Sequence, residues 1–165
     1  ISGDGYFSVQ QADGTIAYSR DGSFKLSADG NLVTAGGQTI LPAITVPQNA
    51  ASLTIGRDGV VTVELANGGG SSQIGQLQLS RFVNNSGLQP VGRNLMQQTN
   101  ASGDPLVVLP GADGAGMLMQ GALEASNVNV VEEMVNMIET QRAYEVNSKA
   151  ISAADGMLRF LNNNL

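Results

Sequence analysis

Few side chains in this sequence could take part in catalysis or bind a metal. Most of the candidates are aspartates that directly precede a glycine. Cysteine and histidine are both absent from the 165 residues. This removes Cys/His zinc sites, thiol catalysis and every histidine-dependent triad. Seven of the eight aspartates stand directly before a glycine, at Asp4, Asp13, Asp21, Asp29, Asp58, Asp113 and Asp155. Because glycine accepts positive φ and aspartate bonds its own downstream backbone, these pairs predict tight turns.

Calcium binding is the chemical alternative for these aspartates. An EF-hand loop supplies several oxygen ligands and a terminal glutamate within about twelve residues, whereas each of these turns offers one carboxylate. The glycine-rich nonapeptide of calcium-binding β-helices is also missing. Turn formation is therefore the stronger interpretation, and the sequence predicts no metal site.

The other candidates for chemistry have simpler structural interpretations. Gly114-Ala115-Gly116 lacks the third glycine of a dinucleotide loop, and no P-loop is present. The pair Glu132-Glu133 fits negative charge at a helix start better than an active site. Five methionines are interpreted as packing residues: Met117, Met119, Met134, Met137 and Met157. Four arginines are interpreted as solvated strand or turn positions, a minority of them in subunit contacts: Arg20, Arg57, Arg81 and Arg93. The sequence thus predicts no enzyme, no cofactor and no small-molecule substrate.

Charge and hydropathy exclude further classes of partner. The net charge is −6 and no basic run occurs, so the chain has no electrostatic reason to bind nucleic acid or an anionic membrane. No apolar run approaches the roughly 18 residues of a transmembrane helix, and no signal-peptide pattern opens the sequence.

Short β-strands are the elements expected through most of the chain. The first four Asp-Gly pairs separate the runs Tyr6–Gln10, Thr15–Ser19, Phe24–Leu26 and Leu32–Thr34, which predict an antiparallel meander. Ser52–Ile55 and Val60–Leu65 predict a hairpin. Gln73–Val83 is a candidate long strand, and Leu88–Val91, Leu95–Thr99 and Met117–Gln120 are weaker candidates. Residues 100–116 are rich in Gly, Pro and Asp and are expected to be partly irregular.

A long amphipathic helix is predicted over Ser126–Leu165. Asn129 is a suitable N-cap, and Glu132 follows at the capping-box spacing. Val130, Met137, Tyr144, Ile151 and Leu158 recur at every seventh position, which places them on one face of a helix. With flanking residues they form the predicted subunit interface, here named the helix stripe: Val130, Met134, Met137, Ile138, Tyr144, Ile151, Leu158 and Leu161.

The neighbouring seam of the heptad is mixed in character. Its positions are Glu133, Thr140, Asn147, Ala154 and Leu161. This seam is too polar for a self-sufficient two-stranded zipper and favours a layer built by several helices. The predicted fold class is mainly β with a long C-terminal α-helix, with a β-rich domain over 1–121 and a coiled-coil-type helix over 122–165.

Two long motifs resemble the bacterial flagellar rod and hook proteins. One runs from Leu123 through Glu145 and continues as Asn147-Ser148-Lys149-Ala150-Ile151-Ser152-Ala153-Ala154-Asp155. The other comprises Gly3-Asp4-Gly5-Tyr6-Phe7, then Ile16 to Phe24, then Gly30-Asn31-Leu32-Val33-Thr34. The segments Leu41–Ile44 and Ile74–Leu79 fit the distal-rod members of this family better than its hook or proximal-rod members.

The resemblance implies a structural role without catalysis. Family members are exported unfolded by the flagellar type III apparatus and polymerise into a helical tube. That tube is the drive shaft of the basal body, which crosses the periplasm through surrounding rings. The implied partners are other copies of the chain, other rod and hook proteins, the rings and the export apparatus. In this family the terminal helices form an inner coiled-coil layer, and the β-rich domain forms the outer layer.

The resemblance also implies a helical segment that pairs with the C-terminal helix and precedes the β domain. The sequence opens at Ile1, where the β domain should start, so that partner helix lies outside these 165 residues. A functional alternative from another class is a β-rich cell-surface or glycan-binding module with a stalk helix. It would need an exposed aromatic platform or an exposed ligand groove, and the three tyrosines and four phenylalanines do not visibly cluster into such a platform.

Overall fold

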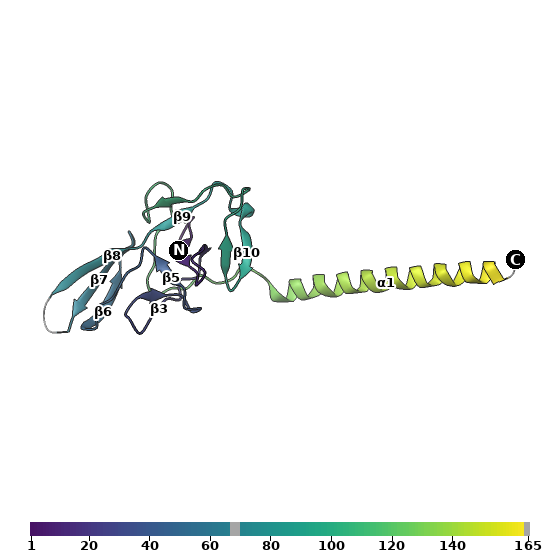
Figure 1. The fold of residues 1–165 in the computed structure, drawn as a ribbon, viewed down its shortest axis with the longest axis horizontal. Coiled ribbons are helices and arrows are strands. Elements are labelled where there is room, and N and C mark those ends of the chain that lie inside the picture. The colour runs from purple at the N-terminus through teal and green to yellow at the C-terminus, as the bar shows by residue number, and fades with distance from the viewer. Residues whose placement is uncertain (67–69, 164–165) are drawn as a thin grey trace. The chain divides into compact units, whose positions relative to one another are not determined.

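The computed structural model describes residues 1–66 and 70–163, with helix side chains described as far as Arg159. Short antiparallel strands occupy the first part of the chain, and one long helix, α1 (Val130–Asn163), occupies the last (Figure 1). The chain divides into two compact units, Ile1–Glu124 and Ala125–Leu165. The predicted fold class is therefore confirmed. The first unit is called the β unit below.

The largest sheet of the β unit has seven antiparallel strands in the order β10-β11-β2-β1-β5-β4-β3. Their bounds are β1 (Phe7–Gln10), β2 (Ile16–Ser19), β3 (Lys25–Leu26), β4 (Leu32–Val33), β5 (Thr39–Leu41), β10 (Gln89–Gly92) and β11 (Leu95–Gln97). The β1–β2 and β3–β4 hairpins form as predicted. The simple meander is wrong, because β5 pairs with both β1 and β4 and separates the two hairpins.

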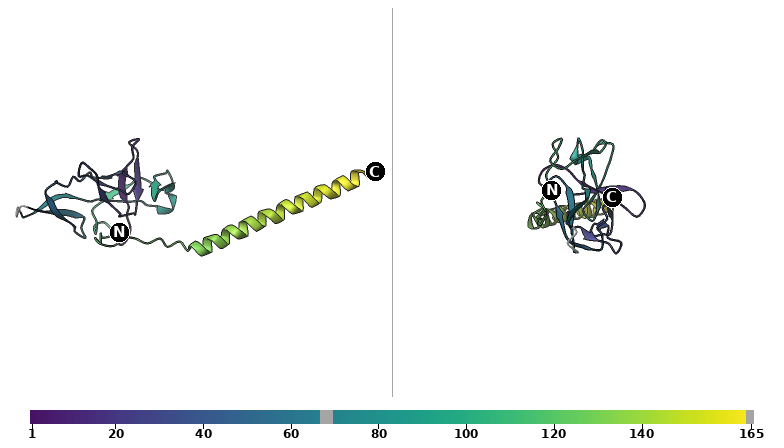
Figure 2. Two further views of the ribbon diagram at one scale, coloured as in Figure 1. Left: turned by 90° about the horizontal axis from the view of Figure 1, so that it is seen from below. Right: turned by 90° about the vertical axis from the view of Figure 1, so that its left-hand side faces the viewer.

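Two smaller sheets complete the β unit. The predicted hairpin is confirmed as β6 (Ala50–Ile55) and β7 (Val60–Leu65), and β8 (Ser71–Gln76) pairs on the other side of β7. These three strands form an arm that projects from the rest of the unit (Figures 1 and 2). The second sheet pairs β9 (Leu79–Arg81) with β12 (Leu106–Val108). The short helical turn η1 (Asn85–Gly87) precedes β10.

The predicted long strand over Gln73–Val83 is wrong, because the chain changes sheets within it. β8 ends at Gln76, and the Leu77 amide then donates to the Gly59 carbonyl at 2.8 Å. From Leu79 onward the chain pairs with β12 instead. Leu77, between the two strands, and Leu79, in β9, are both buried in the same core cluster, so the core continues across the change of sheet.

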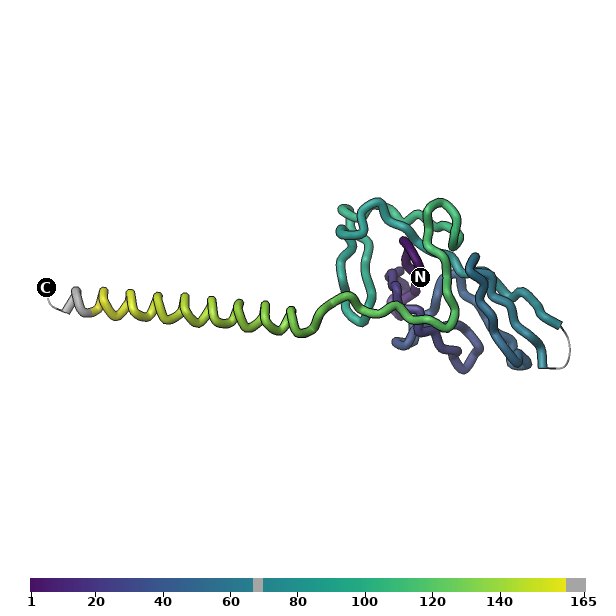
Figure 3. Tube along the Cα trace, turned by 180° about the vertical axis from the view of Figure 1, so that it is seen from behind, coloured from purple at the N-terminus to yellow at the C-terminus, as the bar shows by residue number. Residues whose placement is uncertain are grey.

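The predicted last strand at Met117–Gln120 does not form. Its place is taken by an irregular segment with one bridge, between Ser2 and Met117. This segment runs along the β unit after β12 and before the helix (Figure 3).

The core of the β unit joins side chains from all three sheets. Phe7 and Val9 are buried on one face of β1, as the alternation in that strand predicts. They pack in one cluster with Ile40, Val61 and Leu79. A second cluster holds Tyr18 and Phe82, whose ring centroids lie 4.8 Å apart edge to face, and the Tyr6 ring also packs against Phe82.

Three of the Asp-Gly positions form the predicted turns through their own side chains. The Asp13 carboxylate accepts hydrogen bonds from the amide and hydroxyl of Thr15 at 2.9 and 2.6 Å. Asp21 accepts the same pair of bonds from Ser23, and Asp58 accepts from the Val60 amide. These bonds, led by those from the hydroxyls, hold the pKa values of Asp13 and Asp21 below their ordinary value.

Replacing Asp21 with asparagine is expected to remove a pH-dependent part of the stability of the β unit. A depressed pKa in the folded state stabilises the fold at pH values above the pKa of the unfolded chain. That contribution is lost as pH falls through the lower, folded-state pKa. We expect wild type to exceed Asp21→Asn by about 0.5–1 kcal/mol in unfolding free energy at about pH 6, and the two to converge once the pH has fallen below the folded-state pKa of Asp21.

Urea unfolding across this pH range measures the difference. Asp29→Asn is a matched control, because among the described residues the Asp29 side chain accepts no hydrogen bond. A constant gap between wild type and Asp21→Asn at every pH would contradict the prediction.

Candidate assembly surface

The helix begins where the sequence predicts a cap. The Asn129 side-chain oxygen accepts a hydrogen bond from the Val131 amide at 3.1 Å, and the Asn129 carbonyl accepts from the Glu133 amide at 3.1 Å. Residues 126–129, which the sequence pattern also assigned to the helix, precede it. Glu132 and Glu133 lie in the first turn, where the helix dipole favours negative charge. The helix continues through Gly156 without interruption.

The helix stripe is open to solvent in the single chain. Tyr144 is 79% exposed and Ile151 is 66% exposed. The other described members are exposed as well: Val130, Met134, Met137, Ile138 and Leu158. Leu161, the last predicted member, lies outside the residues whose side chains are described. Large apolar side chains repeated along one face of a helix are usually covered by a partner, so the helix stripe is a candidate contact surface.

Further exposed apolar side chains lie off the predicted stripe. Val131 and Val135 widen the apolar surface over the first turns, and Val146 and Met157 extend it further along. The seven-residue interval does not select these four positions. A plot of the sequence around a helical axis would have shown that they are apolar positions beside the stripe. Near its start, α1 is therefore apolar on more than one side, which fits contact with more than one neighbour.

Two hydroxyl groups of the helix are satisfied within the helix itself. The Thr140 hydroxyl donates to the Asn136 carbonyl of its own helix at 2.8 Å, and the Ser152 hydroxyl donates to the Ser148 carbonyl at 3.0 Å. Thr140 belongs to the mixed seam, and its hydroxyl is satisfied without a partner subunit. Of the predicted charge pairs, Glu145 and Lys149 form an exposed ion pair at 2.9 Å. That pair contributes only a few tenths of a kcal/mol.

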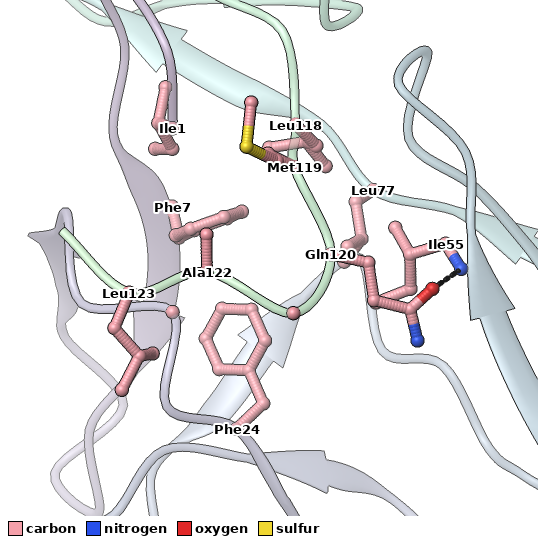
Figure 4. A pocket seen from close by; sticks show the side chains of 12 residues that line it. Ile1, Phe7, Phe24, Ile55, Leu77, Leu118, Met119, Gln120, Ala122 and Leu123 are labelled. Atoms are coloured by element: carbon pink, nitrogen blue, oxygen red, sulfur yellow. Dashed lines mark hydrogen bonds between the residues drawn. The ribbon is translucent and has the colours of Figure 1, made fainter.

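A cavity of about 210 Å³ with a mostly apolar lining lies in the β unit. Phe7, Phe24, Ile55 and Leu77 face it, and residues 118–123 cross over it (Figure 4). The Gln120 amide at its rim bonds to the backbone at Ile55. The lining therefore offers apolar contacts and holds no charged side chain able to act as an acid or base.

The rest of the described chain gathers no reactive centre. No group of three or more acidic side chains comes together among the residues described. The aromatic cluster of Tyr6, Tyr18 and Phe82 packs within the β unit and presents no open platform of rings, so the glycan-binding alternative is not favoured. Within the described part of the chain, α1 lacks the continuous apolar length that a membrane crossing requires.

Comparison with known proteins connects both units to flagellar proteins. Residues 1–63 match the family model described as the flagellar hook protein FlgE/F/G D1 domain, and residues 119–164 match that of the flagellar basal body rod FlgEFG protein C-terminal region. A flagellar basal-body rod protein FlgG of Buchnera aphidicola (subsp. Schizaphis graminum) is 54% identical over 161 residues, covering 98% of this chain and 62% of the relative.

More distant relatives give the same result. The FlgG protein of Bacillus subtilis is 40% identical over 168 residues, covering 99% of this chain and 63% of the relative. The flagellar hook protein FlgE of Escherichia coli is 35% identical over 164 residues, covering 97% of this chain and 40% of the relative. The chain spans about 62% of the length of the first of these rod proteins. With both of its units matched, the chain belongs to the family of flagellar rod and hook proteins.

Proposed function

We propose that this chain is a structural subunit of the distal part of the flagellar rod in the bacterial basal body. The observation that carries the proposal is the likeness to FlgG rod proteins over nearly the whole chain, at 54% identity in the Buchnera relative. The hook protein of E. coli matches at 35% identity, so the rod is the better assignment. The exposed helix stripe supplies the kind of surface that polymerisation requires.

The proposed mechanism is mechanical and involves no catalysis. Helices from many copies interlock through the stripe as an inner coiled-coil layer, and the β units form the outer layer. Each described stripe residue that becomes buried contributes about 1.5–3 kcal/mol, whereas an exposed charge pair contributes a few tenths. The apolar contacts therefore determine how the helices pack. A tube held by such contacts resists bending and transmits torque across the periplasm.

The proposed partners are other copies of the chain and neighbouring rod and hook proteins. Contacts with the surrounding rings and passage through the type III export apparatus belong to the same proposal. The domain assignment is also part of it: residues 1–121 as the outer β domain and residues 122–165 as the inner helix. A segment outside these 165 residues is proposed as the helical partner of α1, consistent with the unmatched 38% of the FlgG relative (100% − 62%).

Purification of basal bodies from a bacterium that carries the full-length gene tests the proposal. We expect mass spectrometry to find the protein in the rod fraction, and electron microscopy of a deletion strain to show basal bodies that end before the hook. A gene shortened to end at Glu124 serves as the control, because it retains the β unit and removes the helix. Complete rods and hooks in the deletion strain would refute the assignment.

A further inference from the structure

Arg20, which directly follows β2, is more than a solvated residue. Its Nε donates to Glu124 Oε1 at 2.7 Å, its Nη2 donates to the Gly3 carbonyl at 2.9 Å, and its Nη1 donates to the Gly5 carbonyl at 3.2 Å. The guanidinium also lies over the Tyr6 ring, 5.8 Å from the ring centroid. A planar fork with five N–H donors can hold three acceptors at once, and a lysine cannot reproduce that geometry.

Glu124 occupies a special place in the chain. It is the last residue of the β unit, and α1 starts at Val130. Only residues 125–129 separate the ion pair from the first helical turn. The two segments matched by the family models, 1–63 and 119–164, therefore meet in the contact between Arg20 and Glu124.

The chain before Glu124 is held mainly by polar anchors. Residues 118–124 are named the strap. The Leu118 amide donates to the Arg57 carbonyl at 3.1 Å, and the Leu118 side chain is buried. The Gln120 side chain accepts from the Ile55 amide at 2.8 Å and donates to the Leu53 carbonyl at 2.9 Å, so it bonds to the edge of β6 as a neighbouring strand would.

Beyond the buried Leu118, apolar packing adds little to these anchors. The strap crosses the cavity of about 210 Å³, so the space beneath it is incompletely filled (Figure 4). Met119 and Leu123 are 58% and 69% exposed. Beyond Gln120, the strap is attached through Glu124, which accepts the bond from Arg20 at 2.7 Å and forms a longer ion pair with the Ile1 amino group at 3.8 Å.

We propose that Arg20 and Glu124, with Gln120 behind them, form a clamp that fixes the root of α1 to the β unit and carries force between them. Arg20 is a positioning residue in this proposal, which rests on the proposed function of the chain as a rod subunit. With the clamp closed, the free linker is 125–129. With it open, the linker extends back to residue 121, and its root-mean-square span grows from about 12 Å to about 17 Å.

A structural measurement on the 165-residue chain tests the clamp itself. We expect backbone order parameters from NMR relaxation to be near 0.85 at residues 121–124 in wild type, and to fall below about 0.6 in Arg20→Ala and in Glu124→Ala. The double variant should have order parameters no higher than Arg20→Ala, because Arg20→Ala leaves the ion pair between Glu124 and the Ile1 amino group in place. Arg20→Lys should lie between, since it keeps the charge and loses the three-way fork.

Lys25→Ala is the matched control, because it removes a positive charge from an exposed position in β3. Its order parameters should equal those of wild type. Unchanged order parameters at 121–124 in both Arg20→Ala and Glu124→Ala would overturn the clamp, whatever the function of the chain.

Motility under load tests the mechanical part. In the full-length gene, Arg20→Ala should still assemble rods, while swimming speed falls more steeply with medium viscosity than in wild type. If Arg20→Ala lowers the order parameters but swims normally at every viscosity, the force-carrying role is overturned and the rod assignment stays intact. Failure of the rod assignment is seen separately, as absence of the protein from purified basal bodies.

Discussion

Tyr144→Asp, and equally Ile151→Asp, is expected to abolish incorporation of the protein into a rod and with it motility. Both side chains project from α1 into solvent in the single chain, at 79% and 66% exposure. In a packed layer of helices, each substitution loses about 1.5–3 kcal/mol of apolar burial. It also buries a carboxylate without a partner, which costs several kcal/mol more. The penalty recurs in every copy, so polymerisation should stop.

The substitutions are introduced into the full-length gene. Electron microscopy of basal bodies then measures rod assembly, and swimming assays measure motility. Circular dichroism and urea unfolding of the purified variants should show a β unit as stable as in wild type, because the two units are separate compact bodies. Normal rods and motility in Tyr144→Asp would contradict the proposal that the helix stripe forms the subunit interface.

Two controls separate apolar burial from a general effect of changing the helix. Tyr144→Phe keeps the ring and should assemble. Lys149→Gln breaks only the exposed pair with Glu145, whose side chains are 75% and 64% exposed, and should also assemble. A loss of rods in Lys149→Gln would show that charge pairs contribute more to the layer than the apolar stripe does.

Local features of this chain could be predicted from sequence because their physical causes are local. The Asn129 cap, the turns at Asp13 and Asp21, and the β6–β7 hairpin each depend on residues within a few positions of one another. The alternation that buries Phe7 and Val9 is local as well. Cap, turn and periodicity rules therefore located these elements to within a few residues.

The order of strands in the large sheet could not be predicted in this way. β5 enters between β1 and β4, and β11 pairs with β2 through Met96 and Tyr18. Such pairings depend on which apolar faces meet in three dimensions, and a one-dimensional pattern does not record that. The break after Gln76 has the same origin, since nothing in the run Gln73–Val83 itself signals a change of partner sheet.

The clamp was hidden from sequence reasoning for a related reason. Arg20 and Glu124 are 104 positions apart, and a lone exposed arginine after a strand is usually solvated. Each residue falls within one of the two motifs that resemble flagellar proteins, but a motif does not state which of its members touch. The predicted helix stripe, by contrast, follows from helical geometry alone, because residues seven apart share a face.

Leu79→Ala is expected to lower the unfolding free energy of the β unit by about 2–5 kcal/mol. Leu79 is fully buried on β9, where it packs in the main core with Phe7 and Leu77 and lies against Gly5. A Cβ built on Gly5 would already lie 3.1 Å from Leu79 Cδ1, so the backbone there approaches the leucine closely. Close packing of this kind leaves a cavity when the side chain is shortened, because the surrounding strands relax only in part.

Leu106→Ala is the matched control for this prediction. Leu106 lies on β12, the strand that pairs with β9, but it is 56% exposed. Its truncation should change the unfolding free energy by less than about 1 kcal/mol. Urea unfolding should show a lower midpoint for Leu79→Ala with an unchanged slope, since the surface exposed on unfolding stays nearly the same. Equal losses in the two variants would mean that β9 does not join the three sheets into one core. The helical signal of residues 130–163 should be the same in both variants, because α1 belongs to the other compact unit.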